Sequence, residues 1–203
     1  MSSHKRWKQA PTLRIKLVTL DNLGLMQKLI LSGIKQYGKV KATNLWLLLL
    51  NNPRLMKGFI YFASRLMPYG ELDRQDTELV ILRVAWNCHC RYEWGQHIDI
   101  GLKTGLRIQD IRLTMQETPS TQATPKQKTL LKACDEFHQH RLIMQSTWQE
   151  LSGFYDQRLL LELLVLIGFY EGLAGVLNSV GLPLDQELEA LVTNVEHELS
   201  QLI

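Results

Sequence analysis

The chain has 203 residues, of which 45% are hydrophobic and 21% are charged, and its formal net charge is +3. These values are ordinary for a globular protein, so they exclude disordered and collagen-like classes, and the length suits one substantial domain. Basic residues elsewhere in the chain alternate with Asp and Glu, so we interpret residues 1–20 as a basic, solvated tail. Its five cationic side chains precede the first acidic residue, and they are Lys5, Arg6, Lys8, Arg14 and Lys16.

Helical patterns then dominate the first half of the chain. Proline suits the first turn of a helix, Asp73 is a favourable N-cap, and Lys103 followed by Gly105 is a typical C-terminal signature. The segment NCHC, residues 87–90, indicates a break between two helices. In chain order we expect helices near Leu23–Tyr37, Thr43–Leu50, Pro53–Leu66, Asp73–Trp86, Arg91–Thr104 and Ile108–Met115.

The second half follows one clear loop, ETPSTQATP, and is helical as well. Its helices are expected at Thr124–His140, from Ser146, at Asp156–Val180 and at Leu184–Leu202. The first two begin with capping-box patterns. The third is apolar nearly all round, which predicts a buried central helix or a subunit interface. Because no alternating strand pattern of useful length occurs, we predict an all-α fold in which residues 21–203 form a single domain.

The sequence also predicts a cytoplasmic protein that makes no use of a membrane. Its N-terminus lacks the apolar run and small-residue cleavage site of a secretory signal. The most apolar stretch, residues 159–184, is interrupted by Glu162 and Glu171, whereas a membrane span needs about 20 nearly uncharged residues. The three cysteines form no disulfide framework, so we expect reduced thiols unless they have a redox function.

The densest group of reactive side chains is the stretch CHCRYEWGQH, residues 88–97. If a helix begins at Arg91, Cys90 lies at its start, and Glu93 and His97 follow on the same face at offsets of three and seven. The helix dipole favours a thiolate at Cys90, whereas the Glu93 carboxylate opposes it. Cys90 is therefore the best candidate nucleophile, and we expect Glu93 to pair with His97.

The segment LMPYGELDRQDTELVILRVAWNCHCRYEWGQH resembles the core of the carboxymuconolactone decarboxylase-like superfamily, which includes alkylhydroperoxidase D. Redox members of that family have a Glu, eleven residues, and then Cys-x-x-Cys-x-x-x-His. Here Glu78, Cys90 and His97 stand in register, while Glu93 replaces the second cysteine. The resemblance covers about residues 45–186. It implies an alkylhydroperoxidase D-like fold of about eight helices and a homo-oligomer such as a dimer, trimer or hexamer.

The resemblance also implies roles for these residues. Cys90 would attack a peroxide as thiolate, His97 would relay a proton, and Glu78 would orient that histidine. Glu93 cannot resolve a sulfenic acid, since that step needs a thiol. Cys88 is the local candidate for a resolving thiol, through a Cys-x-Cys disulfide that only a turn would allow. The alternative resolving thiol is an external reductant. In that case Cys88 would serve only as a small hydrophobic residue.

Packing roles stay open for the other side chains of this region. Cys90 and His97 could be core residues, and Glu78 could be a first-turn acid facing solvent. Three aromatic side chains are expected to pack the wall of a pocket rather than bind a ring substrate, and they are Trp86, Tyr92 and Trp94. Cys134 has apolar neighbours at helical spacing and is expected in the core.

Zinc would accept the cysteines and histidines of this stretch as ligands. However, a single residue between Cys88 and Cys90 is a tight spacing for one tetrahedral ion, and His138 with His140 alone makes a poor pair. We therefore predict no metal and no cofactor.

Three functions remain open. The leading hypothesis is a thiol-dependent, peroxide-reductase-like antioxidant enzyme that uses Cys90. The first alternative is a carboxymuconolactone decarboxylase-like lyase or isomerase, in which His97 and Glu93 perform acid–base chemistry on a small organic acid or lactone. The second alternative is a non-catalytic oligomeric protein that binds a small ligand. In each case the partner is a small molecule, with no nucleic acid and no membrane involved.

Overall fold

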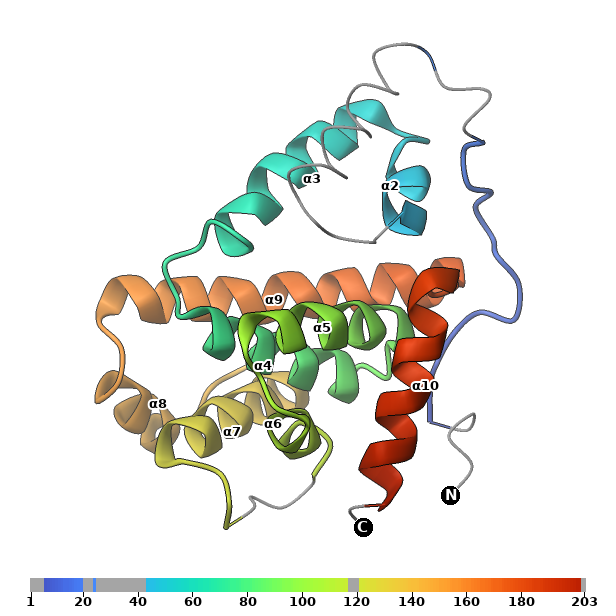
Figure 1. Ribbon diagram of the computed structural model, residues 1–203. Helices are drawn as coiled ribbons and strands as arrows, with labels where there is room; N and C mark the ends of the chain where they lie inside the picture. The colour runs from blue at the N-terminus through green and yellow to red at the C-terminus, as the bar shows by residue number, and fades with distance from the viewer. Residues whose placement is uncertain (1–5, 20–23, 25–42, 117–120, 202–203) are drawn as a thin grey trace.

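The computed structural model describes residues 6–19, 24, 43–116 and 121–201. Within these ranges the chain forms nine α-helices and no strand, which confirms the all-α prediction (Figure 1). The helix expected at Leu23–Tyr37 lies outside the described residues, apart from Gly24. The helices are α2 (Thr43–Leu49), α3 (Pro53–Leu66), α4 (Arg74–Asn87), α5 (Arg91–Thr104), α6 (Ile108–Leu113), α7 (Pro125–His140), α8 (Gln145–Ser152), α9 (Gln157–Val180) and α10 (Gln186–Gln201).

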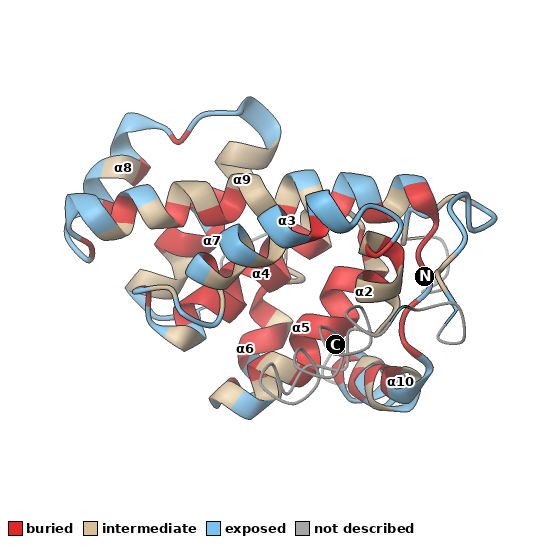
Figure 2. Cartoon of the chain, turned by 90° about the horizontal axis from the view of Figure 1, so that it is seen from above, coloured by how far each residue is buried: buried red, intermediate tan, exposed pale blue. Residues whose placement is uncertain are grey.

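The long helix α9 runs across the molecule, with α2 and α3 on one side of it and α4 to α8 on the other (Figure 1). The most completely buried helix is α4, in which every residue from Asp76 to Ala85 is buried. The prediction of a buried central helix at residues 156–180 is therefore only partly right. One face of α9 packs on α4, while Leu161 and Val176 on the other face are 63% and 53% exposed (Figure 2).

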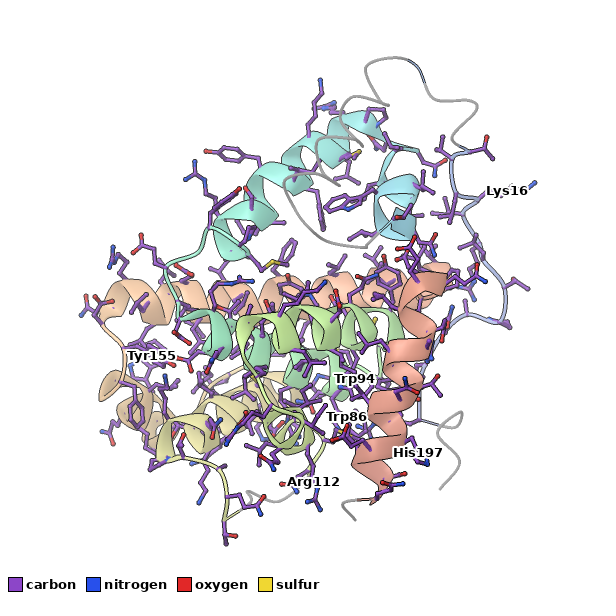
Figure 3. All side chains as sticks on the ribbon, viewed as in Figure 1. Lys16, Trp86, Trp94, Arg112, Tyr155 and His197 are labelled. Atoms are coloured by element: carbon purple, nitrogen blue, oxygen red, sulfur yellow. The ribbon has the colours of Figure 1, made fainter. Side chains whose placement is uncertain are left out.

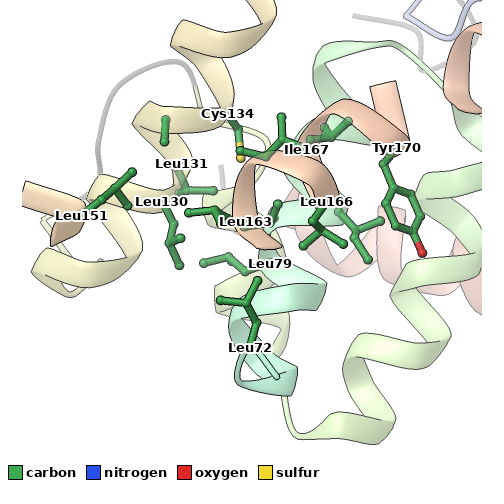
Figure 4. Close-up of a cluster of buried hydrophobic side chains, with 14 of the residues drawn as sticks. Leu72, Leu79, Leu130, Leu131, Cys134, Leu151, Leu163, Leu166, Ile167 and Tyr170 are labelled. Carbon is green, nitrogen blue, oxygen red and sulfur yellow. The ribbon is translucent and has the colours of Figure 1, made fainter. Parts of the chain in front are cut away.

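Two clusters of buried apolar side chains lie on either side of α4. One joins α5, α10 and the end of α9, with Trp94 and Ile98 at its centre. The other joins α4, α7, α8 and α9 (Figure 4). Tyr170 stands at the edge of the second cluster, and Cys134 lies inside it, fully buried as expected. The helix pair α4–α5 is thus held from both faces.

Local signals explain most helix boundaries. The Asp73 side chain accepts hydrogen bonds from the first amides of α4, and Thr124 forms the expected capping box with Gln127 at the start of α7. The capping box expected at Ser146 is wrong, because α8 begins one residue earlier, after Met144. There, the Glu136 carboxylate of α7 accepts a hydrogen bond from the Met144 backbone amide at 2.8 Å, so a side chain from another helix replaces the local cap.

The described part of the N-terminal segment, residues 6–19, has mostly exposed side chains, as expected of a solvated tail, but its backbone is attached to the rest of the protein. Its backbone amides donate to carbonyls at distant points of the chain: Lys8 to His89, Ala10 to Asn178 and Arg14 to Val180, at 2.8–2.9 Å. We call residues 6–14 the N-terminal strap. A Cβ at position 181 would lie 2.6 Å from the Thr12 carbonyl oxygen, so glycine is needed there.

Helix α9 is long and apolar enough to cross a membrane, by length and composition only. Both of its carboxylates are nevertheless engaged with other elements of the protein. Glu162 accepts hydrogen bonds from the backbone amides of Glu71 and Leu72, and Glu171 pairs with His138 and Arg141. Both carboxylates thus bind segments of the same chain, which is how a helix packed within a folded protein satisfies its charged groups.

Candidate functional site

The stretch of residues 88–97 straddles the break that the sequence predicts. Cys88 closes α4, His89 takes a left-handed backbone conformation with φ of 53°, and Cys90 is the N-cap of α5. The Cys90 amide still donates to the Ala85 carbonyl at 2.9 Å, so the chain reverses tightly. This reversal sets α5 against α4 and brings residue 97 of one helix beside residue 78 of the other.

A buried pair, Glu78 and His97, forms the centre of the site. Glu78 Oε2 lies 2.7 Å from His97 Nδ1, and the glutamate is 0% exposed. Arg74, one helical turn earlier, donates to the other Glu78 oxygen at 3.0 Å. Glu78 therefore does not face solvent. It is a buried acid whose two oxygens are bound by a guanidinium and an imidazole, as a buried carboxylate requires.

Glu93 occupies the site without a partner. Its side chain is buried, and neither carboxyl oxygen has a hydrogen-bond partner among the residues that the structure describes. Burial raises its pKa well above the ordinary value of 4.5, so the group is held as the neutral acid. The predicted pairing of Glu93 with His97 is wrong, because Glu78 already takes the Nδ1 atom of that imidazole.

Tyr170 and Arg74 belong to the same site, and sequence reasoning missed both. The Tyr170 ring packs edge-on against the His97 ring, with centroids 5.2 Å apart. Burial, and then the charge of Glu78, raise the Tyr170 pKa well above 10, so its hydroxyl stays protonated. The i, i+4 spacing of Arg74 and Glu78 was a usable signal, whereas a tyrosine in an apolar helix gives none.

Arg74 is the partly exposed member of the site. Its side chain is 32% exposed, whereas Glu78 is fully enclosed. The Nη2 atom of Arg74 is bonded to Glu78, but Nη1 has no hydrogen-bond partner within the described ranges. An anionic group of a ligand could be bound by this free N–H group.

The three cysteines are all free thiols. Cys90 is 0% exposed, and burial is the main cause that raises its pKa well above the usual value. Cys88 is half-buried, and burial is the main cause that raises its pKa to about 12. Its Sγ lies 3.9 Å from His138 Nδ1. No described contact stabilises either thiolate enough to offset burial, and the resolving role of Cys88 stays a prediction.

The aromatic residues expected at a pocket wall divide into two groups. Trp86 and Trp94 lie together near α10 (Figure 3), with ring centroids 5.9 Å apart, and Trp7 of the strap packs on both at 5.4 and 5.2 Å. The Tyr92 hydroxyl instead donates to Asp185 at 3.0 Å and accepts from the Leu45 amide. Tyr92 thus ties α5 to neighbouring elements, and the pocket-wall role of the tryptophans stays a prediction.

Comparison with protein-family models gives a match. Residues 53–136 match the model of the carboxymuconolactone decarboxylase family, a span that contains Arg74, Glu78, Cys90, Glu93 and His97. None of the curated proteins is a detectable sequence relative. The match covers α3 to α7 up to Glu136, so Tyr170 and α9 lie beyond it.

Solved structures share the fold at low sequence identity. An alkylhydroperoxidase AhpD core protein from Ralstonia eutropha JMP134, described as peroxidase-related, is 15% identical with a TM-score of 0.74 and covers 88% of this chain and 96% of its own. The debrominase Bmp8, solved with 2,3,4-tribromopyrrole, is 10% identical with a TM-score of 0.73 and covers 92% and 100%. A putative antioxidant defence protein AhpD from Agrobacterium tumefaciens is 18% identical with a TM-score of 0.59 and covers 64% and 89%.

Proposed function

We propose that the protein is an acid–base enzyme, a lyase or isomerase of a small organic acid or lactone. The match of residues 53–136 to the model of the carboxymuconolactone decarboxylase family supports this class of chemistry. The observation that carries the proposal is Glu93, a buried carboxyl group with no partner for either oxygen. A neutral acid held in this way beside a histidine–glutamate pair is what proton donation at neutral pH requires.

The second group of the proposal is the Glu78–His97 pair. When Nδ1–H of His97 donates to Glu78, the lone pair lies on Nε2, which can then act as a general base. Arg74 holds Glu78 from its other side and so fixes the orientation of the pair. The base and the acid Glu93 lie one helical turn apart on α5, which suits two proton transfers to one small molecule.

The substrate class follows from the remaining groups. The free Nη1 of Arg74 supplies an N–H donor for a carboxylate, and Tyr170 supplies a neutral hydroxyl in the same surroundings. In an isomerisation, Nε2 of His97 removes a proton next to a carbonyl, and Glu93 gives its proton to the resulting enolate. In a decarboxylation, carbon dioxide leaves, its bonding electron pair stays in the enolate, and the Glu93 proton goes to carbon. After the isomerisation, His97 releases the proton that it took and Glu93 regains one, with no net change. After the decarboxylation, Glu93 takes up one proton from solvent.

A second function, thiol-dependent peroxide reduction, has one observation in its favour. Cys90 lies at the N-cap of α5, where the helix dipole favours a thiolate, and it is in register with Glu78 and His97. Its thiolate would cleave the peroxide O–O bond, forming a sulfenic acid and an alcohol. Two equivalents of an external thiol would then regenerate Cys90 and yield water and a disulfide. Its complete burial and raised pKa make this the weaker proposal.

One experiment separates the two functions. The protein is incubated in D₂O with a panel of carboxylated lactones and small keto acids, and NMR measures deuterium uptake and loss of the carboxyl group. Parallel samples receive an alkyl hydroperoxide and dithiothreitol, and peroxide consumption is measured. The variants are His97→Gln and Glu93→Gln, with Cys90→Ser as the matched control.

We expect turnover of at least one organic acid or lactone, a loss of about 100-fold or more in His97→Gln and Glu93→Gln, and near-normal activity in Cys90→Ser. Treatment with an alkylating reagent should leave this activity intact. No turnover across the panel, together with peroxide consumption that Cys90→Ser abolishes, would overturn the acid–base proposal in favour of the thiol enzyme.

A further inference from the structure

A second group of reactive side chains lies outside the acid–base site, where α4, α7 and α9 meet. It consists of Cys88 at the end of α4, His138 in the last turn of α7 and Glu171 in α9. One donor atom from each of the three lies within 4.8 Å of the other two. We propose that these three residues form a binding site for a divalent transition-metal ion of the zinc class.

The distances fit three ligands of one ion. Cys88 Sγ lies 3.9 Å from His138 Nδ1, which lies 2.7 Å from Glu171 Oε1. Zinc–ligand bonds of about 2.0–2.3 Å at tetrahedral angles place neighbouring donor atoms about 3.3–3.6 Å apart. These two separations lie on either side of that range, and the third, between Cys88 and Glu171, is within 4.8 Å, so side-chain shifts of about 1 Å would bring the three atoms to ligand distance.

The geometry is that of a ligand set rather than of a thiol–imidazole–carboxylate relay. A relay uses both ring nitrogens of the histidine, one facing the nucleophile and the other facing the acid. Here the single nitrogen Nδ1 of His138 faces both the sulfur and the carboxylate. An ion at this position replaces the Nδ1 proton, and the ring proton then resides on Nε2.

The donor chemistry selects the kind of ion. Sulfur, imidazole nitrogen and carboxylate oxygen together suit zinc and its close relatives, whereas calcium and magnesium prefer oxygen alone. Ligand binding by cysteine and histidine requires the thiolate and the neutral imidazole, so an ion that binds here displaces a proton from Cys88. Two anionic ligands, the Cys88 thiolate and the Glu171 carboxylate, balance the charge of a divalent ion.

Neighbouring groups hold the ligands in place. Asn178 donates to the Cys88 carbonyl at 3.0 Å, and Arg141 donates to the second carboxylate oxygen of Glu171. His89 lies next in the chain, and its Nδ1 atom is buried without a hydrogen-bond partner among the described residues. Such outer contacts orient metal ligands in known sites.

The site has room for one exchangeable ligand. Three protein ligands and an open fourth position are the arrangement of catalytic rather than structural zinc sites. The His138 side chain is 34% exposed, so an ion can enter from solvent. The positive charges of Arg141 and Lys8 close to the cluster favour an anionic fourth ligand, such as hydroxide.

Cobalt(II) titration of the reduced, full-length protein tests the proposal, because a cysteine ligand gives a thiolate-to-cobalt charge-transfer band. We expect one equivalent to bind, with the band absent in Cys88→Ser and retained in Cys90→Ser and Cys134→Ser. His138→Ala should weaken binding at least tenfold. His140→Ala, on the same helix turn, is the matched control and should bind normally. Circular dichroism checks that each variant is folded.

A measurement on the unaltered protein keeps the test independent of folding. Zinc at ten times the protein concentration should slow iodoacetamide alkylation of Cys88 at least tenfold, as read by peptide mass spectrometry, and leave that of Cys134 unchanged. The absence of stoichiometric cobalt binding, a charge-transfer band that survives in Cys88→Ser, or alkylation unaffected by zinc would each overturn the proposal. None of these results depends on the acid–base activity.

Discussion

The neutral carboxyl group of Glu93 makes a quantitative prediction about stability and pH. The substitution Glu93→Gln replaces the acid by a group of the same shape that does not titrate. In the folded protein the Glu93 pKa is raised well above 4.5, because the side chain is buried without a partner. The folded state therefore keeps a proton that the unfolded state releases. The stability of the native protein falls as pH rises above about 4.5 and continues to fall up to the folded-state pKa.

The size of the effect follows from the number of protons involved. One proton bound only in the folded state lowers the free energy of unfolding by about 1.4 kcal/mol per pH unit. Between pH 4.5 and 6.5, Glu93→Gln should therefore gain up to about 3 kcal/mol relative to the unaltered protein. Below pH 4 the two proteins should differ little, because both then carry a neutral group at this position.

Urea unfolding followed by tryptophan fluorescence at pH 4.0, 4.5, 5.5 and 6.5 measures the difference directly. Glu198→Gln, a substitution of an exposed glutamate on α10, is the matched control and should give a curve parallel to that of the unaltered protein. The reasoning is refuted if Glu93→Gln also runs parallel over this pH range, since Glu93 would then be ionised in the folded protein and unable to donate a proton.

Three further predictions test other parts of the structure, two by urea unfolding and one by measuring molecular mass. Gly181→Ala should lower the free energy of unfolding by about 1–3 kcal/mol, because position 181 has a φ of 75° and touches the strap. The control Gly172→Ala, whose added Cβ meets no atom within 4 Å, should be neutral or stabilising. Equal effects of the two substitutions would contradict the assigned role of the strap. Arg83→Leu should cost about 3 kcal/mol in urea unfolding, since it leaves a carboxylate and two backbone carbonyls without their donor, and a loss below 1 kcal/mol would count against it. If the chain is a homo-oligomer, as the resemblance predicts, Leu161→Asp and Val176→Asp on the exposed face of α9 should shift light-scattering masses towards the monomer, and a monomeric unaltered protein would disprove it.

Much of the fold was predictable because its signals are local. Helix α5 begins at Arg91 and ends at Thr104 as expected, since a chain break precedes it and Gly105 closes it in the left-handed conformation. The start of α8 was not predictable from Ser146, because its stabilising group, Glu136, comes from another helix. Errors thus occurred where a side chain from a neighbouring element replaced a local one.

The site was predictable only in part for the same reason. The register of Glu78 and His97 with a known family pointed to the pair that the structure shows. The isolation of Glu93 and the approach of Tyr170 depend on how α9 packs against α5, which no short-range pattern encodes. His138 and Glu171 are 33 residues apart, and the sequence suggested only His140 as a second ligand beside His138, so the grouping with Cys88 and Glu171 was not predictable.

The N-terminal strap has a consequence for how the chain is made. Residues 6–14 are translated more than 160 residues before two of their backbone partners, Asn178 and Val180. At about 5–20 residues per second, the strap waits roughly 10–30 s for them. Trp7 cannot pack against Trp86 and Trp94 until the strap binds to the folded helices. The strap therefore folds long after it is translated, and the nascent chain exposes an indole beside a cluster of positive charge throughout that interval.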